Sequence, residues 1–185
     1  MKYHVAKDRL AYTGEQLRSN FAYLLFGVIG DSIVAFGGPC DVKQTEMVDI
    51  EDLKAENRIY SDNMLHFIVE HHDTDLEKGV LRQLLLVNIV KDLLNEQLGD
   101  RVVSRSHTDL FDGDSKLSIS VATVTPVSSV IHFGINVSSL NTPVKTKGLA
   151  DYSIEPLTFA DRVVRKYVEE VDKIYKTRCK VKWVE

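Results

Sequence analysis

The sequence HTDLFDGDSKLSISVATVTPVSSVIHFGINV, residues 107–137, holds two apolar runs separated by turn residues. DGDS at 112–115 and TPVSS at 125–129 are typical of turns, since Gly, Pro, Asp and Ser favour turn conformations. The runs at 116–124 and 130–137 are therefore predicted to form an antiparallel hairpin. Lysine and glycine are uncommon inside strands. Lys116 and Gly134 thus indicate a role other than sheet stability.

Alternation along these two strands predicts one apolar and one polar face of the hairpin. Lys116 is expected opposite Asn136 or a residue two positions away, because a one-residue slip would exchange the faces. A helix should cover the apolar face, and the small side chains of the polar face leave room for a ligand. The polar face is predicted to hold Lys116, Ser118, Ser120, His132, Gly134 and Asn136, and the apolar face Leu117, Ile119, Val121, Ile131, Phe133, Ile135 and Val137.

The sequence before the hairpin predicts two helices and two strands. Thr74 and Glu77 form a capping motif ahead of a long amphipathic helix to residue 98, and Gly99 is a typical C-cap. A similar motif starting at Thr13 predicts a helix that continues to about Gly27. Strands are expected at 32–36 and 63–70. GGPCDV at 37–42 is expected to be a loop, since glycine pairs and proline interrupt strands, and the acidic stretch 46–56 a solvated helical turn.

A helix and a strand are expected after the hairpin. Phe159, Val163, Tyr167, Val171 and Ile174 form one stripe of a last helix. Cys179, Val181 and Trp183 alternate in a closing strand, which would bury Cys179 in the core. The fold class expected from this order is α+β, with a mixed, largely antiparallel sheet flanked by helices.

Composition limits the functions that are expected. A chain of 185 residues with 44% hydrophobic content predicts one domain spanning residues 1–185. The net charge of −4 disfavours nucleic acid as a partner, and no apolar run is long enough to cross a membrane. A cytoplasmic protein with free thiols is expected, since the N-terminus lacks a signal-peptide core. No metal is expected either, because His66 and Glu70 would lie about 13 Å apart along one strand.

The order of short motifs around the hairpin resembles the catalytic core of the biotin and lipoate protein ligase superfamily. The motifs are the strand at 101–105, Asp-Leu at 109–110, Lys-Leu-Ser at 116–118 and Gly-Ile-Asn-Val at 134–137. The chain as a whole is similar to an uncharacterised prokaryotic family, domain of unknown function 366. That similarity lies in LAYTG (10–14), FGVIGDSIVAFGGPCDV (26–42), MVDIEDL (47–53), NMLHFIVEHHD (63–73) and the hairpin, and this family brings no established activity.

The superfamily resemblance implies a biotin/lipoate protein ligase-like fold in which a small molecule lies over the sheet. The lysine would lie near the carboxylate or phosphate end of that molecule. ATP or an acyl-adenylate is the cofactor that the resemblance would imply. A homodimer is also expected, because the resembling ligases pair edge to edge and open sheet edges tend to be covered.

Two functions stay open. One is an enzyme of acyl or carboxylate transfer, with Lys116 as electrostatic catalyst, Asn136 and Asp109 orienting the ligand, and the Gly37–Asp41 loop as a lid. The other is a non-catalytic binding or interaction protein. This alternative protein would have kept the sheet pocket and lost the adenylate-forming loop, since GGPCDVKQTEMVD, with one lysine and three acids, stands where the ligases carry an arginine- and glycine-rich loop. The remaining candidate ligand-binding residues are Gly134, Ser118, His132, Gly37, Gly38 and His66.

Overall fold

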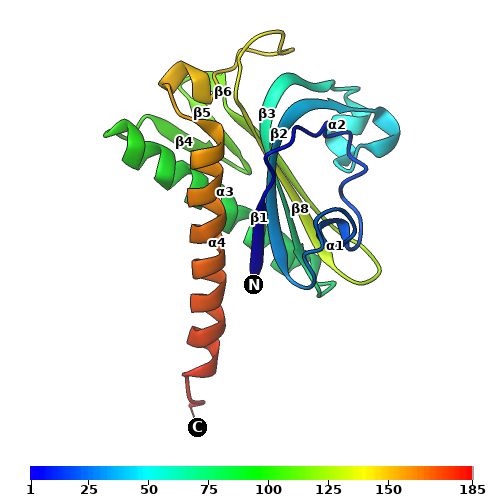
Figure 1. Cartoon of the computed structure of the whole chain (residues 1–185), viewed down its shortest axis with the longest axis vertical. Coiled ribbons are helices and arrows are strands. Elements are labelled where there is room, and N and C mark those ends of the chain that lie inside the picture. The colour runs from blue at the N-terminus through cyan, green and yellow to red at the C-terminus, as the bar shows by residue number, and fades with distance from the viewer. Residues whose placement is uncertain (185) are drawn as a thin grey trace.

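The computed structural model describes residues 1–184 and is built around a twisted five-stranded sheet (Figure 1). The strand order is β1-β2-β3-β8-β7, and every neighbouring pair is antiparallel except β1 with β2. The mixed, largely antiparallel α+β fold expected from the sequence is confirmed. The strands of this sheet are β1 (Lys2–Val5), β2 (Ser32–Val42), β3 (Ile59–His71), β7 (Ser118–Val124) and β8 (Ser129–Asn136).

The two faces of the sheet bury different apolar clusters. Helices α3 (Leu76–Leu98) and α4 (Pro156–Cys179) cover one face, where the larger cluster lies. The other face is covered by the N-terminal segment around Tyr12 and by the short helix α1 (Phe21–Phe26), which enclose a smaller cluster. Strand β3 contributes side chains to both clusters and is therefore buried on both sides.

A small second sheet lies beside the main one and carries the start of the hairpin. Its strands are β4 (Val103–Ser106), β5 (Asp109–Asp112) and β6 (Ser115–Lys116). The Leu117 N–H donates to the Leu110 carbonyl, which ties the two sheets together. Short helical segments complete the chain: the 3₁₀ turns Gln44–Glu46 and Leu149–Tyr152, and α2 (Ile50–Lys54).

The long helix expected at 74–98 is confirmed, with a different cap. The Asp75 carboxylate, rather than Thr74, accepts the Lys78 N–H and caps α3. Gly99 ends the helix in the left-handed region at φ 71°, where glycine carries no steric penalty.

The first helix is much shorter than the expected 13–27. The capping bond from the Thr13 N–H to Gln16 forms, but only turns follow, and α1 begins at Phe21. Asn20 adopts φ 61° and donates its N–H to the Glu70 carboxylate at 2.7 Å. This long-range bond fixes the left-handed turn at Asn20 that interrupts the expected helix. Local capping signals do not reveal it.

The segment GGPCDV, expected as a loop and a lid, is the second half of β2. Cys40 and Val42 pair with β3, and a bulge lies between Gly38 and Cys40. The N-terminal segment crosses over it, since a Cβ on Gly38 would lie 1.8 Å from the Leu10 carbonyl oxygen. Proline is tolerated at a bulge because its missing N–H leaves no gap in the ladder. The expectation of a loop that acts as a lid was therefore wrong.

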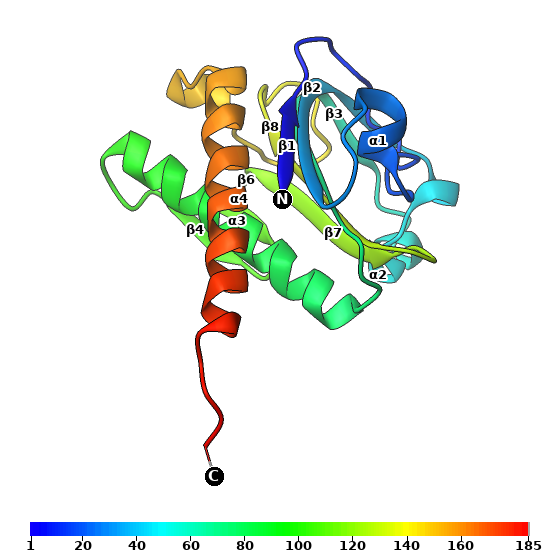
Figure 2. The ribbon, with the colours of Figure 1, turned by 60° about the horizontal axis from the view of Figure 1, so that its bottom comes forward.

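The prediction of a closing strand at 179–183 is also wrong. Helix α4 continues to Cys179, which is exposed rather than in the core, and residues 180–184 have no regular structure. Helix α4 itself packs against β1 and β2. The end of α4 and the tail instead project from the body (Figure 2).

Candidate functional site

Two adjoining cavities, together called the cleft, lie over the face of the sheet opposite α3. The first has a volume of about 340 Å³ and the second about 220 Å³. They share four lining residues, Asp52, Ile59, Lys116 and Ile119. The first is further lined by Asn57, Arg58, Tyr60, Met64, Ser118, Asn136, Thr142, Pro143, Val144 and Thr146.

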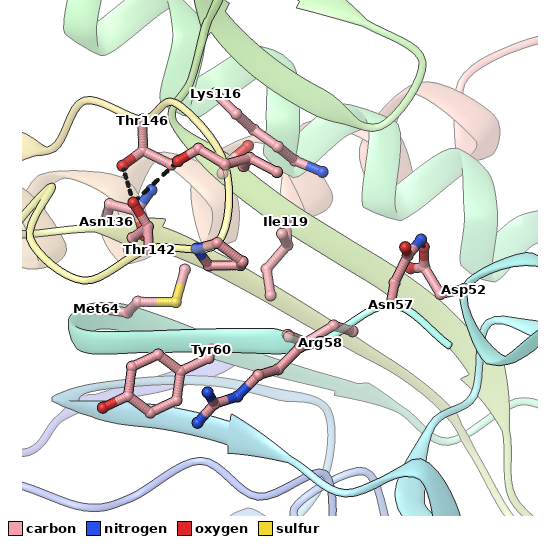
Figure 3. Close-up of a pocket in the computed structure, with 14 residues that line it drawn as sticks. Asp52, Asn57, Arg58, Tyr60, Met64, Lys116, Ile119, Asn136, Thr142 and Thr146 are labelled. Carbon is pink, nitrogen blue, oxygen red and sulfur yellow. Dashed lines mark hydrogen bonds between the residues drawn. The ribbon is translucent and has the colours of Figure 1, made fainter. Parts of the chain in front are cut away.

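Lys116 is held at the boundary of the two cavities by its own backbone. Its N–H donates to the Lys145 carbonyl, and its carbonyl accepts from the Lys147 N–H. Figure 3 shows the side chain extending over Ile119. The ammonium group lies 2.7 Å from the Asp109 carboxylate, and both side chains are about one-third exposed or less. Lys116 is therefore a cation fixed in the wall of the cleft.

Asp109 lines the second cavity, and its carboxyl group is in a poorly solvated place. Burial raises the pKa of Asp109, and Lys116 opposes that rise. One oxygen, Oδ1, is buried without a hydrogen-bond partner. A carboxyl group in this situation can accept a hydrogen bond from a ligand. It also takes up a proton more readily than a carboxyl group in water.

The register of the hairpin differs from the expected one by a single residue. Ser118 pairs with Ile135, and Ile119 pairs with Gly134. The cause is Leu117, which separates β6 from β7 and buries its side chain in the larger core cluster. Alternation therefore starts anew after Leu117.

This register exchanges the expected faces of β7, while those of β8 are as expected. Ile119 lies on the cleft side, not in the core. Ser118 borders the first cavity, but its hydroxyl accepts the Leu110 N–H, and Ser120 accepts from Gln83 of α3. Lys116, His132 and Asn136 remain on the cleft side.

Asn136 and Gly134 contribute to the floor in different ways. Asn136 is buried beside Thr142 and Thr146, whose hydroxyls bond each other at 2.8 Å (Figure 3). Gly134 does not line either cavity, but a Cβ there would lie 2.9 Å from Met64 Cε. The missing side chain makes room for the Met64 methyl group, which lines the first cavity.

His66 and His132 form a buried neutral pair under the N-terminal segment. Their Nδ1 and Nε2 atoms are 3.1 Å apart, and His66 Nε2 lies 3.3 Å from the Gly38 carbonyl oxygen. Burial lowers the pKa of His66 to about 4 and that of His132 well below its usual value. The Tyr12 ring stacks on His132 at 3.6 Å. His132 borders the second cavity, whereas His66, Gly37 and Gly38 line neither.

Several cleft residues have no signal in the sequence pattern. Arg58, whose guanidinium lies 4.2 Å over the Tyr60 ring, precedes the run predicted as a strand. Thr142 and Thr146 belong to an irregular segment. The acidic stretch expected to be solvated lies partly against the second cavity, which Glu46, Asp49, Glu51 and Asp52 line. Only tertiary structure brings these residues to Lys116.

Other classes of site receive no support from residues 1–184. No group of three or more His, Cys, Asp or Glu side chains there is arranged to hold a metal ion. In the same residues, no helix combines the length and apolarity needed to cross a membrane. Burial raises the pKa of the Cys40 thiol to about 12, so the thiol is unreactive at neutral pH.

A family model described as "Domain of unknown function (DUF366)" matches residues 1–182. An uncharacterised protein of Methanocaldococcus jannaschii is 39% identical over 178 residues, which cover 91% of this chain and 78% of that protein. A solved protein of unknown function from Pyrococcus horikoshi has a TM-score of 0.92 and 39% identity, covering 100% of this chain and 99% of the other.

More distant solved structures share the fold. A biotin protein ligase from Aquifex aeolicus in complex with biotin and ATP has a TM-score of 0.61 at 11% identity, covering 94% of this chain and 70% of the ligase. A putative lipoate protein ligase from T. acidophilum with bound lipoic acid has a TM-score of 0.58 at 14% identity, covering 93% and 86%. The ligase-like fold expected from the motifs is thereby confirmed.

Proposed function

The chain belongs to the DUF366 family, and on that premise we propose that its cleft binds a small molecule carrying a carboxylate or phosphate group. The observation that carries the proposal is the position of Lys116 in the wall common to both cavities. An ammonium group has three N–H donors, and one suffices for Asp109. The others are free to bind an anionic oxygen.

A second cation supports an anionic ligand in the first cavity. Arg58 lines that cavity, and no carboxylate within residues 1–184 forms an ion pair with it. Its guanidinium lies over the face of the Tyr60 ring, which attracts the cation but leaves its charge unneutralised. Figure 3 shows the guanidinium turned away from Lys116, so the two cations would bind separate acceptor groups of one ligand.

The rest of the first cavity is suited to an apolar group. Met64, Ile119 and Pro143 line it, and Asn136 with the two threonines adds a few polar groups. A cavity of this size and mixture is typical of small-molecule sites. The ligand class proposed is therefore an apolar or cyclic body with an anionic head.

The second cavity bears on whether a reaction follows binding. Lys116 is placed to stabilise negative charge on an acyl oxygen, with Asn136 and Asp109 orienting the ligand, as acyl or carboxylate transfer would require. Glu46, Asp49 and Glu51 nearby repel the phosphates of a nucleotide. This acidic wall favours the alternative function, binding without adenylation.

The test is to identify what the cleft retains and then to titrate it. Mass spectrometry of small molecules released from denatured protein should show a carboxylate or phosphate compound. Calorimetry with biotin, lipoic acid and ATP then compares the parent protein with Lys116→Met and with Lys145→Met, a neighbouring exposed lysine outside the cleft. Equal affinities in all three proteins, or no released compound and no binding heat, would refute the proposal.

A further inference from the structure

Helix α4 carries one apolar stripe along its length, of which only the first half is covered. Ala160, Val164 and Tyr167 are fully buried against the body. The same spacing of four and three residues continues through Val171, which is half-buried, to Ile174, whose side chain is 54% exposed. Alternating spacings of three and four are those of a helix seam that packs against another helix. From Asp172 to Val184 every residue is exposed.

The exposed half of α4 and the tail also carry a concentrated charge. Residues 173–182, called the tip, hold five basic residues and no acidic one. The other 175 residues hold 18 basic and 27 acidic residues, a net charge of −9. Of the tip cations, Lys173 pairs with Glu169 and Glu170, while Lys176, Arg178, Lys180 and Lys182 form no ion pair with residues 1–184. The tip is thus complementary to the body of the same chain.

We propose that a second copy of this chain covers the stripe, with the two α4 helices antiparallel and the two-fold axis near Ile174. A parallel pair would bring two tips of charge +5 together, whereas an antiparallel pair separates them. Each tip then lies beside the acidic body of the other copy, and Glu170 faces the partner's Arg178. Trp183, which is 80% exposed, is carried towards the other body as well.

The dimer is expected to be weak and sensitive to salt. Two half-helices and their tails bury less surface than a permanent interface does, so association in the micromolar range is expected. Sedimentation velocity at rising protein concentration should show a growing dimer fraction. Because opposite charges hold the tips, that fraction should fall as salt is added.

One pair of variants tests the stripe. Ile174→Gln, which keeps helix propensity, should raise the dimer dissociation constant about tenfold or more, as for a central interface residue. The control is Leu81→Gln on α3, whose side chain is 60% exposed and should not affect assembly. Both side chains are exposed, so both variants are expected to fold. Circular dichroism checks this.

A second pair tests the orientation in a Cys179→Ser background, which removes the exposed native thiol. Oxidation should join two copies through Ile174→Cys, since residues on the axis meet. Arg178→Cys should not cross-link, because its two copies would lie roughly 12 Å apart along the helices. A monomer throughout the micromolar range, or efficient cross-linking through Arg178→Cys, would overturn the proposal. A monomer whose tip instead binds a single-stranded oligonucleotide would do so too.

Discussion

The Lys116 ammonium group forms an ion pair with Asp109 at 2.7 Å, between the last residue of β6 and the first of β5. The lysine is therefore not a solvated charge at a sheet edge. Its position depends on a carboxylate whose pKa is raised by burial. Stability is expected to depend on this pair, and so is the ligand binding proposed for the cleft.

Removing Lys116 should destabilise the fold, because Asp109 would keep its buried carboxylate without a partner. Lys116→Met should lower the free energy of unfolding by about 1–3 kcal/mol. The double variant Lys116→Met with Asp109→Asn should recover part of that loss, since no unpaired charge remains. Urea unfolding measures both, with Lys145→Met as control. Equal stability of Lys116→Met and the parent would contradict the importance of the pair.

The same lysine should dominate ligand affinity. Lys116→Met is expected to weaken binding of the copurified compound by about 1.5–3 kcal/mol, the value of a charge-assisted hydrogen bond. Asn136→Ala should act in the same direction. The two effects should not add, because both side chains would contact one ligand. Calorimetry on folded variants decides, and strictly additive losses would place the two residues on separate ligands or parts of the cleft.

Stability should fall as the pH drops from about 6.5 towards 4. In the unfolded chain, histidines take up protons below about pH 6.5, whereas burial lowers the pKa of His66 to about 4 and that of His132 well below its usual value. The unfolded state binds more protons in this window, so acid favours it, by up to about 1.4 kcal/mol per pH unit for each histidine.

One histidine variant should flatten this dependence. His132→Gln keeps an N–H donor for His66 but cannot titrate. Urea midpoints at pH 7 and pH 5 should therefore differ less in this variant than in the parent. The control His107→Asn changes an exposed histidine at φ 50°, where asparagine is tolerated, and should leave the slope unchanged. An unchanged slope in His132→Gln would show that the pair does not set the acid sensitivity.

Two neighbouring glycines should respond very differently to alanine. Gly38→Ala forces a Cβ against the Leu10 carbonyl, and separating the N-terminal segment from β2 should cost about 1–3 kcal/mol or more. Gly37→Ala meets nothing within 4 Å and should be nearly neutral. Thermal unfolding compares the two. A tolerated Gly38→Ala would mean that the N-terminal segment is not held on β2 as described.

The carboxylate of Asp52, like the acidic wall beside it, should weaken anion binding. Asp52 lines both cavities, and Asp52→Asn removes one repelling charge, so affinity for the anionic compound should rise by roughly fivefold, about 1 kcal/mol. Asp92→Asn, an exposed acid on α3, serves as control. If affinity falls instead, Asp52 contacts the ligand as a hydrogen-bond acceptor.

Local sequence signals predicted α3 and the faces of β8 well, because the amphipathic spacing of each element matches the cluster it buries. They failed where one long-range contact decides. Leu117 resets the alternation of β7, Asn20 breaks the first helix by bonding Glu70, and Gly38 lets a strand continue under Leu10. None of these contacts has a local signature. The single-domain organisation and cytoplasmic location remain predictions.

The residues expected in the candidate site likewise divide into those that line a cavity and those that do not. Lys116, Ser118 and Asn136 lie near strand ends and line the first cavity. Asp109 and His132 line the second. His66 was expected in the cleft from the alternation of its strand, and Gly37 and Gly38 from the loop expected at 37–41, but none of the three lines a cavity. Arg58 could not be foreseen, because its position follows from how far β3 extends.

The order in which the strands appear along the chain has a consequence during synthesis. A ribosome that has released residues up to His71 has provided β1, β2 and β3, which pair with one another. The cleft does not exist at that stage, because β7 and β8 are made some fifty residues later and pair last. A chain that has not yet reached Thr146 cannot form the proposed ligand site, because the first cavity needs residues up to that point. The proposed ligand would therefore stabilise only a chain in which β7 and β8 have formed, where binding would shift the folding equilibrium towards the native state.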